Sequence, residues 1–332
     1  MRFFVNCLKN RILFLQNYLL LFNYNKSILP KSSATRKNGV ARKSVCTGDK
    51  MKDCFFTLGG GQFWEDVMIY RDWRIQRNLT SRKFRLLDEF DIVRGEGGFE
   101  ACLREWEKCK RAYVLPPLDK HLTLCLHSFG QTRKAFRRIC SEFRARGMEA
   151  AAIDYPSMQR GIRGHIKQLE FVLNNLATDG VKEVSFVTFG CGNVVLEQLL
   201  AHKGEWTKRL KLGRAVEIAP QIRGSHLLEK LSCYKFTSFV LGAMAKELGG
   251  ERFAKLHAVP DLEIGVIAPA KSRRRSFWEA LLRVRRKFDS AAAIKSFCGA
   301  KELIKPRARE NRALNDKAVC TAAAYFVQKG KF

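Results

Sequence analysis

Long apolar runs, separated by turn-forming residues, dominate the chain from residue 120 onward. His121–Leu126, 148–153 and 184–188 are nearly continuous hydrophobic segments, which is typical of strands buried on both faces. The intervening segments have helical periodicity. Strands that alternate with helices predict an α/β fold with a doubly wound, mostly parallel sheet. Further strands are expected at 212–219 and 262–268, and helices at 133–146, 162–176 and 193–202.

A shorter pattern precedes this region. Alternating runs at 63–69, 73–78 and 83–87 predict three antiparallel strands, with tight turns at Arg71-Asp72 and Thr80-Ser81. Gly97-Gly98 ends this small N-terminal β-meander. A helix is expected at 99–111, with Phe99, Cys102, Trp106 and Cys109 on one face. Three strands rarely fold alone, so we expect the unit to pack on the larger domain.

The first fifty residues have a different composition. Residues 1–22 combine basic and apolar side chains, which suits a signal or an interfacial membrane anchor, and 31–50 resemble a flexible basic linker. Alternatively, Met51 is the true start. We therefore divide the chain into a basic segment at 1–50, the meander unit at 51–117, and a main domain at 118–332 with a lid-like insert at 227–257.

The charge points to partners more than to fold. Lys and Arg outnumber Asp and Glu by 61 to 32, which gives a formal net charge of +29. Such a potential attracts an anionic membrane surface, and the segment 273–287 has the pattern of a basic amphipathic helix. An ordinary domain helix with solvated arginines also explains the segment 273–287. A general drift of the composition toward Lys and Arg also explains the net charge of the chain. Nucleic-acid binding has only the charge in its favour. We expect a cytoplasmic or peripheral inner-membrane location.

The cysteines indicate a reducing environment. The chain has 11 of them, an odd number, with no Cys-x-x-Cys pair. Cys125 lies inside an apolar run, where a free thiol packs as a small hydrophobe. No metal site and no cofactor motif is expected.

Several motifs in order carry a family resemblance. The second buried strand ends in the motif Ile153-Asp154-Tyr155-Pro156. The strand expected at 212–219 leads into Ala219-Pro220 and Arg223-Gly224-Ser225, and the apolar motif at 263–267 lies in the strand expected at 262–268. With these motifs, residues from about 60 to 332 resemble bacterial lipase-like members of the α/β-hydrolase family. The resemblance implies an α/β-hydrolase fold and an acyl-transfer site with a serine, an acid and a histidine.

The resemblance also shows what this chain lacks. Where the family has Thr-His-Ser-Leu-Gly-Gly, the chain reads Thr188-Phe189-Gly190-Cys191-Gly192-Asn193, which places Gly190 at the serine position. The family's histidine aligns near Asn311, and its acid near Asp289, the one member retained. Cys191 is a less favoured alternative nucleophile, because its use shifts the turn by one residue.

Other parts of the site survive by the same resemblance. His127 corresponds to the histidine of the family's His-Gly-x-Gly turn, where it supports the loop, and Ser128 replaces a glycine. The backbone amides of Phe129 and Cys191 would form a pair of oxyanion-type donors. The insert 227–257 resembles a lid over acyl substrates, although core packing explains its apolar residues as well.

Three hypotheses follow. The first is a catalytically inactive hydrolase-fold protein that binds an acyl or lipid ligand, or a partner. The second is an active lipase or esterase that uses atypical residues. The third is a decaying gene product with no retained function. Loss of both the attacking hydroxyl and the imidazole base favours the first, because together they perform nearly all of the acyl chemistry.

Overall fold

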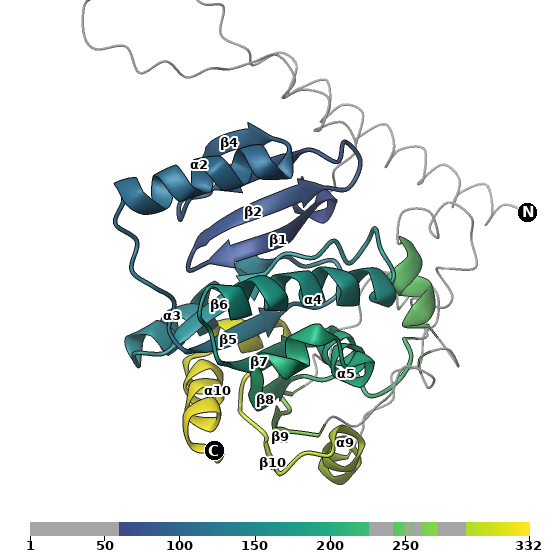
Figure 1. Ribbon diagram of the computed structural model, residues 1–332. Coiled ribbons are helices and arrows are strands. Elements are labelled where there is room, and N and C mark those ends of the chain that lie inside the picture. The colour runs from purple at the N-terminus through teal and green to yellow at the C-terminus, as the bar shows by residue number, and fades with distance from the viewer. Residues whose placement is uncertain (1–59, 226–241, 250–252, 254–260, 271–289) are drawn as a thin grey trace, which may run out of the picture. The chain divides into compact units, whose positions relative to one another are not determined.

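A six-stranded parallel sheet forms the centre of the computed structural model (Figure 1). The structure describes residues 60–225, 242–249, 253, 261–270 and 290–332, all within the unit Met51–Phe332. The predicted basic segments at 1–50 and 273–287, and most of the insert 227–257, lie outside the described residues.

The order of the sheet is β10-β9-β8-β7-β5-β6. Its order reverses at β5, which pairs with β6 on one side and with β7 on the other. Such a reversal opens a crevice at the carboxyl ends of the strands, where ligands bind in open α/β sheets. The strands are β5 (His121–Leu126), β6 (Glu149–Ile153), β7 (Glu183–Phe189), β8 (Lys211–Ile218), β9 (Glu263–Ile267) and β10 (Glu302–Ile304).

Helices cover both faces of this sheet, which confirms the predicted doubly wound α/β class. Adjacent strand residues point to opposite faces, so Phe186 of β7 lies in one apolar core and Val187 in the other. The first core is covered by α4 (Ile162–Thr178) and α5 (Gly192–His202), and the second by α3 (Arg137–Ala145) and α10 (Lys317–Lys329) (Figure 1).

The N-terminal antiparallel meander is also confirmed, with one strand more than predicted. The missed strand, β4, contains two glycines and alternates between half-buried and exposed positions, so its apolar signal is weak. The helix α2 buries Cys102, Trp106 and Cys109, as its pattern predicts. The elements are β1 (Trp64–Tyr70), β2 (Trp73–Asn78), β3 (Phe84–Leu87), β4 (Val93–Gly97) and α2 (Phe99–Ala112).

The meander contacts the main sheet through a polar junction. The backbone N–H of Asp66 in β1 donates to the carbonyl of Asp154, just after β6, at 3.0 Å, and the N–H of Asp154 donates back to Asp66 Oδ2 at 2.7 Å. Gln168 of α4 donates to both of their carbonyls. These contacts bring the meander beside the carboxyl ends of β5 and β6.

The C-terminal part differs most from the sequence prediction. The helix α9 (Ala291–Cys298) and the short strand β10 have no long apolar run, and we did not predict them. Ser290 caps α9, because its hydroxyl accepts the N–H of Ala293 at 3.1 Å. A 3₁₀ helix, η6 (Glu310–Asn315), then leads into α10. β10 pairs in parallel with β9 and so extends the sheet by one strand.

Candidate functional site

A sharp strand-to-helix turn joins β7 to α5. Gly190 has a left-handed backbone with φ of +54°, and Cys191, with φ of −73°, is the N-cap of the helix. A Cβ on Gly192 would lie 2.4 Å from the carbonyl oxygen of Leu126, so the first helical turn passes directly over the end of β5. The strained position in the turn is therefore residue 190 and not residue 191.

Ser128 fills the space in front of this turn. A Cβ built on Gly190 would lie 2.4 Å from the Ser128 hydroxyl oxygen and 2.9 Å from its Cβ, well inside van der Waals contact. Ser128 lies in the loop after β5, so a side chain from one loop stands where the other loop would present its own. The two positions are sterically coupled, and glycine at 190 fits serine at 128.

The expected oxyanion donors both have internal acceptors. The N–H of Phe129 donates to Cys191 Sγ at 3.1 Å, and the N–H of Cys191 donates to Ser128 Oγ at 3.3 Å. A carbonyl or carboxylate ligand would have to displace these two acceptors to reach the amides. The structure brings the two residues together, as the resemblance implies, and uses their amides to join the loops after β5 and β7.

The Cys191 thiol has the wrong environment for a nucleophile. Its side chain is buried, and burial raises the pKa of the thiol above its ordinary value. The thiol is therefore protonated at neutral pH, and its sulfur already accepts one hydrogen bond. These observations favour a packing role over attack on a carbonyl.

His127 holds the loop after β5 in place. Its Nδ1–H donates to the Ser128 carbonyl at 2.9 Å, and its Nε2 accepts the N–H of Tyr155 at 3.5 Å. The ring stacks on the Tyr155 ring with 4.0 Å between centroids, and the Tyr155 hydroxyl donates to the His127 carbonyl. With both nitrogens engaged, this imidazole supports the loop and has no lone pair to offer a substrate.

The remaining predicted positions are only partly described. Asn311 is exposed in η6, beyond the carboxyl ends of β9 and β10, where a β-bridge between Ala270 and Arg309 continues their pairing. It therefore lies at the same edge of the sheet as Gly190. Asp289 lies outside the described residues.

A second buried histidine lies behind this loop. His165 of α4 is fully buried against the Tyr155 ring, and neither of its ring nitrogens has a hydrogen-bond partner among the described residues. Burial lowers the pKa of His165 to about 3 and that of His127 to about 4. Sequence reasoning missed His165, whose neighbours come from another segment.

These histidines predict acid destabilisation. Their folded pKa values lie below the ordinary 6.5, so the unfolded state binds more protons as pH falls and the folded state loses stability. Above pH 6.5 both histidines are neutral in the folded and the unfolded state, and the free energy of unfolding has its full value. At about pH 4.5 each buried histidine lowers the free energy of unfolding by about 3 kcal/mol. Urea unfolding at about pH 7 and about pH 4.5 should show a smaller loss for His165→Leu than for the wild type. The exposed His202→Gln should match the wild type, and an unchanged loss in His165→Leu would refute this account.

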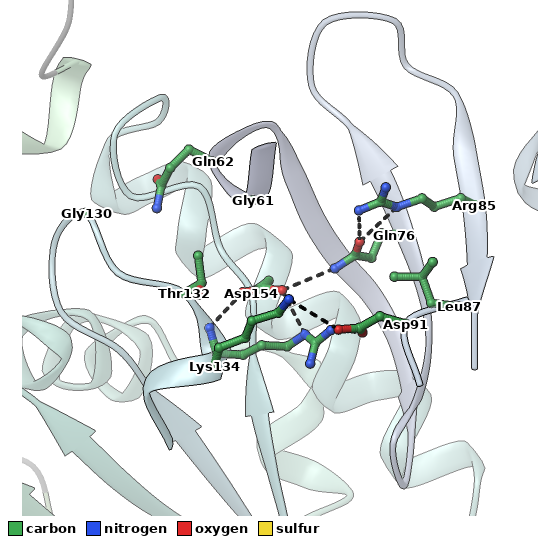
Figure 2. A pocket seen from close by; sticks show the side chains of 11 residues that line it. Gly61, Gln62, Gln76, Arg85, Leu87, Asp91, Gly130, Thr132, Lys134 and Asp154 are labelled. Atoms are coloured by element: carbon green, nitrogen blue, oxygen red, sulfur yellow. Dashed lines mark hydrogen bonds and ion pairs between the residues drawn. The ribbon is translucent and has the colours of Figure 1, made fainter. Parts of the chain in front are cut away.

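A pocket of about 410 Å³ opens next to the loop after β5 (Figure 2). One wall comes from β2, β3 and the loop after β3, and the other from the residues that follow β5 and β6. Asp154 was visible in the sequence as part of a motif, whereas the other charged residues of the lining had no sequence signal. They are Gly61, Gln62, Gln76, Arg85, Leu87, Asp91, Gly130, Thr132, Arg133 and Lys134.

Three further features of the described residues concern metal ligands, membrane-spanning helices and cysteines. No group of His, Cys, Asp and Glu side chains in the described part of the chain is arranged to hold a metal ion. Within the same residues, no helix has the length and apolar character to cross a bilayer. The cysteines that the structure describes are all buried and free of disulfides.

No protein-family model matches the sequence, and no curated protein matches it. Solved structures with a similar arrangement of the backbone include lipase BlEst2 of Bacillus licheniformis, with 15% sequence identity and a TM-score of 0.41. The match covers 59% of this chain and 84% of the lipase. A lipase-esterase related protein of Clostridium acetobutylicum has 15% identity and a TM-score of 0.40, over 61% and 92%. A monoacylglycerol lipase of Paleococcus ferrophilus has 10% identity and a TM-score of 0.40, over 59% and 88%.

Proposed function

We propose that this chain is a non-catalytic protein of the α/β-hydrolase type, which binds a ligand or partner at the carboxyl edge of its sheet without cleaving it. The observation that carries the proposal is the contact between Gly190 and Ser128. The residue with the left-handed backbone in this turn is a glycine without a side chain, and the Ser128 hydroxyl occupies the space where an attacking group would stand.

The described residues also place no free imidazole beside the turn, which supports the same conclusion. A serine-type hydrolase needs an imidazole that reaches its nucleophile from the loop after the last strand. The sequence has no histidine after His257. His127 is the histidine next to the turn in the described chain, and both of its nitrogens are engaged by backbone groups.

Cys191 and Ser128 are the remaining candidates for attack, and their surroundings argue against both. The Cys191 thiol is buried, with a raised pKa. The Ser128 hydroxyl accepts the Cys191 N–H and lies 3.6 Å from its sulfur, and no imidazole contacts it among the described residues. A hydroxyl without a base has an ordinary, weak nucleophilicity.

Hydrolysis of p-nitrophenyl acetate and butyrate tests the proposal. We expect the wild-type chain, Cys191→Ala and Ser128→Ala to release p-nitrophenol at one common rate, equal to that of an unrelated protein at the same concentration. Release that saturates with substrate and is lost in either variant would contradict the proposal. Mass spectrometry of the intact protein after incubation would then show whether an acyl group is attached to that side chain.

A further inference from the structure

The pocket of Figure 2 contains a cation, Arg85, that has no carboxylate partner in the described part of the chain. The Arg85 guanidinium lies over the Trp64 ring, 3.8 Å from its centroid, and its Nε and Nη2 donate to Gln76 Oε1 at 3.1 and 2.7 Å. No acidic side chain among the described residues is within ion-pair distance of it. The stacking and the two hydrogen bonds hold the guanidinium in place and leave its charge uncompensated at contact range.

The other charged groups of the pocket are paired with one another. Arg133 Nε lies 2.9 Å from Asp154 Oδ2, and Arg133 also pairs with Asp91. Lys134 Nζ lies 3.5 Å from Asp91 Oδ2. Three cations and two carboxylates therefore line the pocket, and the difference of one positive charge corresponds to Arg85.

Two of these cations, Arg85 and Lys134, lie on separate walls of the pocket. Arg85 comes from β3 of the meander, while Lys134 follows β5 in the main domain and is exposed. Figure 2 shows both side chains lining the same cavity. A pocket of about 410 Å³ falls within the range of small-molecule sites. Its lining is polar apart from Leu87 and the glycines, which suits a hydrophilic ligand.

We infer that this pocket binds a small anion that carries a carboxylate or phosphate group, with Arg85 as the principal contact and Lys134 as the second. The inference rests on the proposed function and specifies its ligand class. Planar guanidinium forks match carboxylate and phosphate oxygens, and such charge-assisted bonds are stronger in a partly buried site than in water. The bound oxygen would supply the negative charge that Arg85 lacks.

Titration calorimetry of the full chain with inorganic phosphate, and separately with acetate, tests this inference. Arg85→Gln should weaken binding about tenfold or more, as expected for loss of a charge-assisted hydrogen bond. Lys134→Gln should weaken it about threefold, because an exposed ammonium contributes less. Arg104→Gln is the matched control, since Arg104 is exposed on α2 and does not line the pocket. It removes the same charge and should leave the affinity unchanged.

The control separates a site from the general attraction of a basic protein. Equal losses in Arg85→Gln and Arg104→Gln, or the absence of saturable binding by the wild type, would overturn the inference. Thermal unfolding of Arg85→Gln without ligand reports whether that variant is folded. If it is not, Lys134→Glu becomes the deciding variant, because reversal of this exposed charge should abolish binding. Ester hydrolysis is measured independently, so turnover by a chain that binds phosphate would refute only the proposed function.

Discussion

Replacement of Asp66 by Ala is expected to lower the free energy of unfolding by about 3–5 kcal/mol, the typical cost of leaving a buried charge without its partner. Asp66 is fully buried in β1, and Arg74 of β2 is nearly so. Arg74 Nη1 donates to Asp66 Oδ2 at 2.8 Å. Without the carboxylate, the buried guanidinium keeps one long hydrogen bond among the described residues, to the Ala152 carbonyl at 3.3 Å.

The same carboxylate also holds the junction between the meander and the main sheet. Asp66 Oδ1 accepts from Gln76 Nε2 at 2.8 Å, and Oδ2 accepts the backbone N–H of Asp154 at 2.7 Å. In the alanine variant the Asp154 N–H would lose this acceptor, and Gln76 Nε2 would keep its longer bond to Asp154 Oδ2, at 3.3 Å, so the cost rises further. Asp66→Asn keeps the shape of the side chain and one acceptor oxygen, so its loss should be smaller.

Asp72 provides the control for this prediction. It lies on the same hairpin and pairs with Arg144 at 2.7 Å, but both side chains are more than 40% exposed. Asp72→Ala should therefore cost at most about 1 kcal/mol. Urea unfolding at neutral pH, followed by circular dichroism and tryptophan fluorescence, compares the variants. Equal losses for Asp66→Ala and Asp72→Ala would mean that burial of the pair contributes nothing.

Sequence reasoning succeeded where one segment determines its own structure. The runs at His121–Leu126 and 184–188 are apolar enough to be strands buried on two faces, and the structure has β5 and β7 there. The glycine at residue 190 predicts a sharp turn before α5, which the structure also has. Sequence reasoning failed for β4 and β10. Those strands pair at the edges of their sheets and are not fully buried, so neither has a continuous apolar signal.

The pocket is invisible to such reasoning for a different reason. Arg85, Lys134 and Asp154 belong to three segments, and only the docking of the meander on the sheet brings them together. No local pattern marks Arg85 as a cation with a neutral partner. The steric coupling between residues 128 and 190 did have a signal in the sequence. By the family resemblance, Ser128 stands where a glycine is expected and Gly190 stands where a serine is expected.

The steric coupling between Ser128 and Gly190 predicts the effect of the substitution Gly190→Ser. Gly190→Ser should lower the free energy of unfolding by about 3 kcal/mol, with about 1–2 kcal/mol from the left-handed backbone and the rest from the overlap with Ser128. Adding Ser128→Gly removes the overlapping atoms. The double variant should therefore be more stable than Gly190→Ser by about 1–2 kcal/mol, a coupling of the size found between residues in contact.

Gly147→Ser is the matched control for this cycle. Gly147 has a similar left-handed backbone, with φ of +71°, but a Cβ there would meet no atom within 4 Å. Gly147→Ser should show the backbone strain alone, and Ser128→Gly should not relieve it. Additive losses for Gly190→Ser and Ser128→Gly would show that the two loops are not sterically coupled. The double variant should still hydrolyse no p-nitrophenyl ester, because His127, the imidazole beside residue 190 in the described part of the chain, has both nitrogens engaged by backbone groups.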